Sequence, residues 1–160
     1  MHIRQDSLIK KEKIMIRELQ KNDYDGFIGL LDEFYHSSAV LHPVSTENYD
    51  ITFNRCINGD KFTACFVDEK NSLLRGYVLL SFTYSNEVGG ICVWVEELYV
   101  KDEYRGHSIG TSLLNYVHEK YSPYAKRFRL EVTHSNHGAA KLYERMGYET
   151  LDYRQMTKDL

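Results

Sequence analysis

The sequence is poor in the residues that mark disulfide scaffolds, metal centres and disordered chains. Its 160 residues include three cysteines, two prolines and one tryptophan. The cysteines are Cys56, Cys65 and Cys92; their number is odd, and no two have the spacing of metal ligands. Cys65 and Cys92 lie in apolar runs, which is typical of small core residues. This usage fits a reducing compartment, so we expect a cytoplasmic protein without structural disulfides.

The chain also lacks a strong charge of either sign and a long hydrophobic run. Lys and Arg number 20 and Asp and Glu number 23, for a formal net charge of -3. The basic residues are scattered, so the sequence predicts no nucleic-acid partner. No apolar run approaches the length of a membrane span, so no membrane partner is expected. Residues 1–13 are polar and are expected to form a tail before a single domain at 14–160.

What is present is a regular alternation of helical and strand patterns. Apolar residues at helical spacing predict helices near residues 22–34, 46–57, 109–122 and 136–146. Runs of β-branched and aromatic residues predict strands at 14–17, 62–67, 74–84, 91–100, 127–133 and 148–157, the last forming one or two strands. The strand–helix–strand unit in the middle implies one parallel pair. The predicted fold is a single α/β (α+β) domain, with a mixed, mostly antiparallel twisted sheet of six to seven strands flanked by four helices. Thr46 fits the N-cap of the second helix, and Gly147 fits the C-cap of the last.

The sharpest motif is the junction between strand 91–100 and the helix that follows it. Its turn contains Arg105, Gly106 and Gly110. A strand–turn–helix junction exposes backbone N–H groups at a helix N-terminus, and these favour a phosphate or pyrophosphate. Glycine lets the backbone approach the anion, and arginine adds a fixed positive charge. On spacing alone, an ordinary turn with glycines is an equally good interpretation.

The loop resembles the acetyl-CoA loop of the GNAT superfamily of N-acetyltransferases, because it reads Arg105-Gly-His-Ser-Ile-Gly110 against Arg/Gln-x-x-Gly-x-Gly/Ala. A second match, to the family's fifth strand and following helix, consists of Leu130-Glu-Val-Thr-His-Ser-Asn136, Ala139, Leu142-Tyr143 and Gly147-Tyr148. The resemblance covers residues 94–148 and implies the GNAT fold. One position departs from the pattern, since the fourth loop residue is usually glycine and here is Ser108. Its side chain either crowds the pyrophosphate or uses its hydroxyl to cap the helix or bond a phosphate oxygen.

The resemblance implies acetyl-CoA as the co-substrate, and no metal. The residues that it implies for acetyl-CoA binding are Leu98, Tyr99, Val100, Arg105, Gly106, His107, Ser108, Ile109, Gly110, Asn136 and Tyr143. The backbone of residues 98–100 is expected to pair with the pantetheine arm where the fourth and fifth strands splay apart, and one of its N–H groups to meet the oxyanion. Asn136 begins the last helix, so it is expected to cap that helix, to bind the arm, or both.

Acetyl transfer by direct attack needs a base for the amine and an acid for the departing thiolate. Glu96 and Glu97 are adjacent on the predicted strand, so we expect them to point to opposite faces. Apolar neighbours raise the pKa of a carboxylate toward the range of a general base. Resemblance to the diamine acetyltransferases points to Glu96 first and Glu97 second; a surface glutamate or an ion-pair partner is the alternative. Tyr143 resembles the tyrosine that protonates the departing sulfur, although a core aromatic has the same helical spacing.

The acceptor site is expected to include Tyr35, His36, Tyr49, Tyr84 and Glu96, because the first helices and their loop usually supply much of it in this family. The resemblance favours a small primary amine, polyamine-like or amino-acid-like. Acetylation of a protein amine, and a domain that binds acetyl-CoA without turnover, are the alternatives. A homodimer is common among members of the family and is expected here by analogy.

Overall fold

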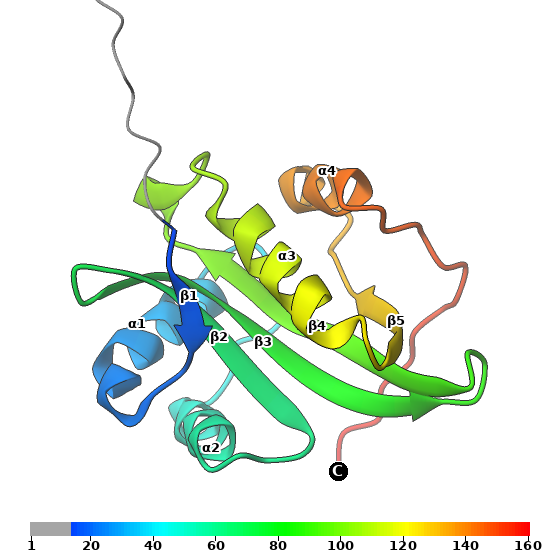
Figure 1. Cartoon of the computed structure of the whole chain (residues 1–160), viewed down its shortest axis with the longest axis horizontal. Helices are drawn as coiled ribbons and strands as arrows, with labels where there is room; N and C mark the ends of the chain where they lie inside the picture. Colours follow the sequence, from blue (N-terminus) through cyan, green and yellow to red (C-terminus); the bar gives the residue numbers. More distant parts are fainter. Residues whose placement is uncertain (1–13) are drawn as a thin grey trace, which may run out of the picture.

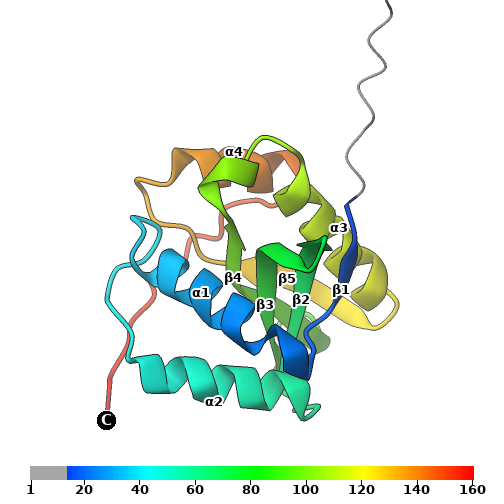
Figure 2. The same cartoon turned by 90° about the vertical axis from the view of Figure 1, so that its left-hand side faces the viewer.

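The computed structural model describes residues 14–160, which form a five-stranded sheet with helices on both faces (Figure 1, Figure 2). The strands are β1 (Ile16–Glu18), β2 (Thr63–Lys70), β3 (Leu73–Ser85), β4 (Gly90–Val100) and β5 (Ala125–Leu130). The helices are α1 (Tyr24–Tyr35), α2 (Thr46–Ile57), α3 (Ile109–Tyr121) and α4 (His137–Arg145), with short 3-10 turns η1 (Lys21–Asp23) and η2 (Asp102–Tyr104). The strands lie in chain order; β1 to β4 are antiparallel, and β4 and β5 are parallel across α3. The predicted mixed sheet with one parallel pair is therefore confirmed.

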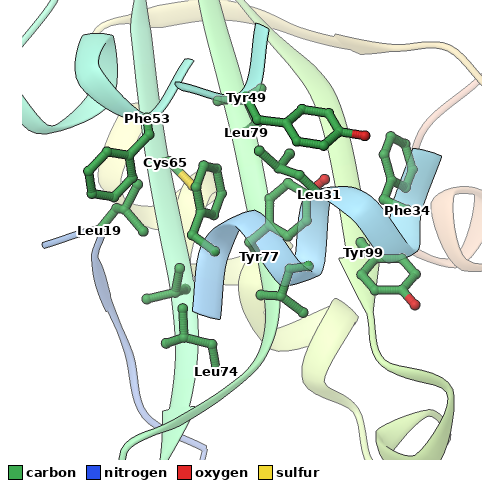
Figure 3. Packing of buried hydrophobic residues seen from close by; sticks show 13 residues of the cluster. Leu19, Leu31, Phe34, Tyr49, Phe53, Cys65, Leu74, Tyr77, Leu79 and Tyr99 are labelled. Carbon is green, nitrogen blue, oxygen red and sulfur yellow. The ribbon is translucent and has the colours of Figure 1, made fainter. Parts of the chain in front are cut away.

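Two apolar clusters hold the helices against opposite faces of the sheet. Strand alternation sends Tyr77 and Leu79 of β3 to the cluster under α1 and α2, and Val78 and Leu80 to the cluster under α3. Figure 3 shows the first cluster, in which the aromatic side chains of α1, α2, β3 and β4 pack together. We call the two surfaces of the sheet the α1–α2 face and the α3 face.

The sheet of residues 14–160 has fewer strands than the six to seven predicted. The segment 148–157 forms no strand, and most of its apolar side chains are exposed. At the end of α4, Gly147 has a φ of 86° and the Tyr148 N–H donates to the carbonyl of Tyr143 at 3.0 Å. This left-handed turn confirms Gly147 as the C-terminal cap and folds Tyr148 back onto α4.

Two of the helices, α2 and α4, begin where a side chain accepts a hydrogen bond from one of their first N–H groups. Ser45, rather than the predicted Thr46, is the N-cap of α2, because its Oγ accepts a hydrogen bond from the Glu47 N–H at 3.3 Å. The helices α1 to α4 have 12, 12, 13 and 9 residues. Within residues 14–160, no helix has both the length and the apolar character needed to cross a membrane.

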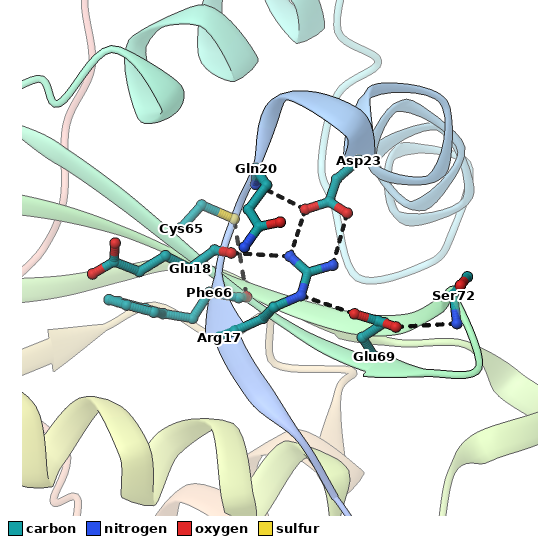
Figure 4. A network of polar contacts seen from close by, with 8 residues as sticks. All are labelled: Arg17, Glu18, Gln20, Asp23, Cys65, Phe66, Glu69 and Ser72. Atoms are coloured by element: carbon teal, nitrogen blue, oxygen red, sulfur yellow. Dashed lines mark hydrogen bonds and ion pairs between the residues drawn. The ribbon is translucent and has the colours of Figure 1, made fainter.

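Arg17 of β1 ties the first strand to the start of α1 and to β2 (Figure 4). Its Nη1 and Nη2 donate to the two carboxylate oxygens of Asp23 at 2.6 and 2.8 Å, and its Nε donates to Glu69 at 2.9 Å. Burial raises the pKa of Asp23, but the hydrogen bonds from Arg17 and from the Gln20 N–H outweigh burial and hold this pKa below its usual value. The bidentate pair fixes where α1 begins, and so positions the far end of that helix.

Candidate active site

β4 and β5 separate halfway along β4. Their last parallel pair is Val95 with Leu130, whereas β4 stays paired with β3 as far as Val100. Among the residues that the structure describes, the β4 backbone from Glu96 to Val100 therefore has no strand paired with it on its β5 side, and we call this side the open edge of β4. An extended ligand that carries amide groups can bind such an edge as an added strand. The residues 98–100 predicted to bind the cofactor lie on it.

The loop after β4 brings a helix N-terminus next to the open edge. Gly106 and Ser108 have φ values of 78° and 64°, and α3 begins at Ile109. The first N–H groups of a helix have no intrahelical partner and, with the helix dipole, favour an anion. The Ser108 side chain makes no capping hydrogen bond to α3 within residues 14–160, so of the alternatives for its side chain the structure does not support the cap. The left-handed backbone at Ser108 explains why a glycine suits this position.

Arg105 and His107 are directed at the backbone of their own loop. The Arg105 Nε donates to the carbonyl of Val100 at 3.0 Å, and its Nη2 lies 2.8 Å from the Asp102 carboxylate. The guanidinium also lies 5.6 Å from the centroid of the Tyr99 ring. The Nδ1 of His107 lies 3.0 Å from the carbonyl of Arg105. Arg105 therefore braces the turn against β4 while its exposed side remains open to a ligand.

A β-bulge places both acidic residues on the α1–α2 face of the sheet. Two consecutive residues of β3 pair with Val95 and with Glu97, so Glu96 between them is the extra residue of the bulge. Glu96 accepts a hydrogen bond from Ser81 and Glu97 accepts one from Tyr77, and both donors belong to the α1–α2 face of β3. The prediction that the two glutamates point to opposite faces is wrong, because strand alternation fails at a bulge. We call Glu96 and Glu97 the acid pair.

The two members of the acid pair have different surroundings. The hydroxyls of Tyr35 and Tyr77 donate to the two carboxylate oxygens of Glu97 at 2.5 and 2.6 Å. Burial raises the pKa of Glu97 above its usual value, although the two tyrosine hydrogen bonds lower it; the charge of Glu96 raises it further. Glu96 is exposed. The site thus combines an enclosed carboxylate of raised pKa with an accessible carboxylate beside it.

The ends of α1 and α2 meet the acid pair through stacked tyrosines. Tyr35 of α1 packs on Tyr49 of α2 with ring centroids 5.7 Å apart and planes 27° from parallel. His36 follows Tyr35, but its side chain is 76% exposed and its Nδ1 lies 2.8 Å from the carbonyl of Asp32. The structure therefore brings Tyr35 to the acid pair and leaves the His36 ring against its own helix.

Tyr84 lies away from the acid pair, contrary to the expected acceptor site. It pairs with Ile91 near the far end of the β3–β4 hairpin, whereas Glu97 pairs with Leu79, five positions earlier on β3. At the rise of a strand, that separation is about 17 Å. The odd spacing also puts Tyr84 on the α3 face, so the structure does not bring it together with the acid pair.

The helix α4, which carries Tyr143, packs through Leu142 where the start of α3 meets β4. A Cβ atom on Gly110 would lie 3.5 Å from the Leu142 side chain and 3.9 Å from that of Leu98, so α3, α4 and β4 meet here. Tyr143 follows Leu142 and is 9% exposed. Burial raises the pKa of Tyr143 to about 12, so the hydroxyl keeps its proton at neutral pH. Within residues 14–160 this hydroxyl makes no hydrogen bond and is available as a donor.

Both ends of α4 are fixed around Tyr143. Asn136 caps the helix, since its side-chain oxygen accepts a hydrogen bond from the Ala139 N–H at 3.1 Å, which confirms the expected cap. At the other end Tyr148 packs on Tyr143, with ring centroids 5.9 Å apart and one ring edge toward the other ring. The Tyr148 hydroxyl lies 2.8 Å from Nε2 of His118 on α3. These contacts hold the Tyr143 ring in one place.

Sequence reasoning missed the two β3 residues that bond the acid pair. Tyr77 and Ser81 are four apart, so strand alternation puts them on one face, next to β4. A signal was present, because hydroxyl side chains at this spacing interrupt the apolar pattern of β3. Without the register between β3 and β4, the sequence did not show which β4 side chains these hydroxyls would bond.

The site combines an open strand edge, a helix N-terminus suited to an anion, paired carboxylates and a protonated tyrosine. This combination is typical of acyltransferases that take their acyl group from a nucleotide-bearing thioester. The comparison with protein families agrees. The model of the Acetyltransferase (GNAT) family matches residues 22–148, so the chain belongs to this family of acetyl-CoA-dependent N-acetyltransferases.

Individual relatives support the same assignment. A thialysine N-epsilon-acetyltransferase of Mus musculus is 29% identical over 145 residues, which cover 85% of this chain and 84% of that protein. Among solved structures, a possible acetyltransferase from Clostridium difficile 630 is 19% identical with a TM-score of 0.80, covering 93% of this chain and 99% of that one. The aminoglycoside N-acetyltransferase AAC(6')-Iy in complex with CoA is 14% identical with a TM-score of 0.76, covering 92% and 95%. At these identities the solved structures show the shared fold.

Proposed function

We propose that the protein transfers the acetyl group of acetyl-CoA to a primary amine of a small molecule by direct attack of the amine. The observation that carries this proposal is the bulge in β4, which puts Glu96 and Glu97 together on one face. Two adjacent carboxylates attract a cationic amine, and one of them can then take its proton. The same stretch of β4 has its open edge on the β5 side, so acceptor and donor meet at one segment of one strand.

The residues present fit acetyl-CoA, which supplies the activated acetyl group. The open edge of β4 offers backbone N–H and C=O groups to an amide-bearing arm. Gly106 bears no side chain, and a Cβ there would have no atom within 4 Å, so the loop has room for a pyrophosphate next to the α3 N-terminus. Arg105 lies at the same turn with an exposed guanidinium. One N–H of the open edge is also suited to donate to the thioester oxygen.

The acid pair divides the proton transfer between its members. Glu96 is exposed, so it can contact the incoming ammonium group. Glu97 has the raised pKa, which favours holding a proton at a pH where an ordinary glutamate would release it. Tyr143 is protonated and lacks a hydrogen-bond partner among residues 14–160, which supports its proposed role as the donor to the departing sulfur.

The acceptor is proposed to be a small amine, polyamine-like or amino-acid-like, rather than a protein. The supporting observations are the narrow setting of Glu97 between tyrosines and the names of the curated relatives, which specify the ε-amine of thialysine. All three cysteines are free thiols, which supports the proposed cytoplasmic location. The homodimer stays a prediction.

The test is release of free CoA thiol from acetyl-CoA with a panel of spermidine, putrescine, lysine, an aminoglycoside and a short peptide, with acetyl-CoA binding measured by calorimetry. We expect turnover with a small amine and none with the peptide. Binding of acetyl-CoA without turnover on any amine would support a sensor domain and contradict the proposal.

A further inference from the structure

Four side chains line up across β3, β4 and β5 on the α1–α2 face. Ser81 pairs with Trp94, and Trp94 pairs with Arg129, so the three project from the same face of the sheet. The neighbours of Arg129 on β5 confirm this, because Phe128 and Leu130 pack in the α3 cluster on the other face. Ser81 donates to Glu96, so the exposed member of the acid pair belongs to the same row.

Arg129 forms no ion pair among residues 14–160, although the Glu87 carboxylate, which pairs with Arg127, lies close enough for a charge interaction with it. Its guanidinium carbon lies 4.3 Å from the centroid of the Trp94 ring, and no carboxylate of the described chain forms an ion pair or hydrogen bond with it. Arg127, two positions earlier on the same face, instead pairs with Glu87. Stacking on an aromatic ring fixes the guanidinium plane and leaves the N–H groups at its rim free for a planar anion.

The spacing between Glu96 and Arg129 suits an acceptor with two charges. Glu96 lies two residues beyond Trp94 along β4, and Arg129 lies on the next strand beside Trp94, so their backbones are about 8 Å apart. An extended lysine has its ε-amine on the order of 7 Å from its carboxylate. A polyamine would instead set a second ammonium group near the guanidinium, where like charges repel.

We infer that Arg129, held flat by Trp94, binds the carboxylate of the acceptor, so that the acceptor is an amino acid with a side-chain amine and not a polyamine. This inference rests on the proposed acetyl transfer, in which Glu96 receives the amine. Arg129 then selects the substrate and takes no part in proton transfer. Arg129 contributes to substrate binding, so its replacement should raise KM for the amino acid and leave kcat unchanged.

The experiment compares lysine with cadaverine, the diamine that lacks the carboxylate, and with lysine amide, which keeps the α-amine. We expect wild-type protein to prefer lysine to both in kcat/KM. Arg129→Gln should lower kcat/KM for lysine at least about tenfold, through KM, as loss of one charged hydrogen bond requires, and leave cadaverine unchanged. Arg129→Lys should recover part of the loss, and the control Arg127→Gln should match wild type on all three amines.

Several outcomes would overturn the inference. Equal loss on lysine and cadaverine in Arg129→Gln would mean that Arg129 only supports the sheet, and no loss on lysine would mean that it does not touch the acceptor. A wild-type preference for cadaverine would also contradict it, while leaving the proposed acetyl transfer intact. Failure of every amine in the wider panel, with acetyl-CoA bound, would instead reject the proposed function and this inference with it.

Discussion

Replacing Ser108 by glycine should stabilise the fold, because the residue before α3 has a left-handed backbone. Its φ of 64° costs a residue with a side chain roughly 1–2 kcal/mol, and glycine escapes this cost. Glycine loses more backbone entropy on folding, by about 0.5–1 kcal/mol. The Ser108 hydroxyl makes no capping hydrogen bond within residues 14–160, so little else is lost. The expected net gain in the free energy of unfolding is about 0.5–1 kcal/mol.

The assay is thermal and urea unfolding of Ser108→Gly beside two controls. For a chain of this size the gain corresponds to a rise in Tm of about 1–4 °C. Ser108→Ala removes the hydroxyl but keeps the left-handed cost, so its stability should stay close to wild type. Gly106→Ala introduces that cost at a φ of 78° with no atom near the new Cβ, so it should lose about 1 kcal/mol. A large loss in Ser108→Ala, or a less stable Ser108→Gly, would refute the reasoning, because the hydroxyl would then be bonded to the folded chain.

Three further predictions follow from the hydrogen bonds of the site and of β1. Tyr143→Phe should leave the acetyl-CoA affinity measured by calorimetry unchanged and lower kcat by at least about tenfold, because a proton donor to the sulfur acts as the thiolate leaves and not when acetyl-CoA binds. An unchanged kcat would remove Tyr143 from the mechanism. With Glu97 as the base, kcat/KM should rise with pH through the raised pKa of Glu97. Tyr77→Phe removes a hydrogen bond that lowers this pKa, so it should move the rise in the pH profile to higher pH. A shift of that rise to lower pH would contradict the assignment of Glu97 as the base. The depressed pKa of Asp23 contributes stability that is present above its unfolded pKa and is lost as pH falls through the lower folded value. Arg17→Met should therefore be destabilised by about 2 kcal/mol at pH 7 and by much less at pH 2, as measured by urea unfolding. An equal loss at both pH values would mean that packing, not charge, is responsible.

The sequence predicted the order of the elements and the segment of the site, because both depend on local patterns. Strand alternation in β2, β3 and β4 and helical spacing in α3 are visible in a single chain. The loop from Arg105 to Gly110 lies where the motif placed it, between β4 and α3. Asn136 and Gly147 were recognisable as helix ends because each is a preferred capping residue next to a segment with helical spacing.

The sequence could not predict features that depend on pairing between distant segments. The bulge that turns Glu96 and Glu97 to one face exists only in the register between β3 and β4. Tyr77 and Ser81 gain their roles from that register as well. The segment 148–157 has an apolar pattern typical of a strand, but a strand also needs a paired neighbour in the sheet, which the pattern of one segment does not show. The distance between Tyr84 and the acid pair likewise depends on the register of the β3–β4 hairpin, which the sequence did not show.

The central claim is that the acid pair and the open edge of β4 deliver an acetyl group from acetyl-CoA to an amine. The most direct measurement follows a carbonyl-labelled acetyl group from acetyl-CoA by NMR, with purified protein and each small amine of the panel in turn. The account predicts that the label appears as an amide carbon on the nitrogen of at least one of these amines, and that Glu96→Gln combined with Glu97→Gln abolishes this product while acetyl-CoA still binds. Label that stays on CoA or appears only as free acetate with every amine, or full amide formation by the double variant, would contradict it.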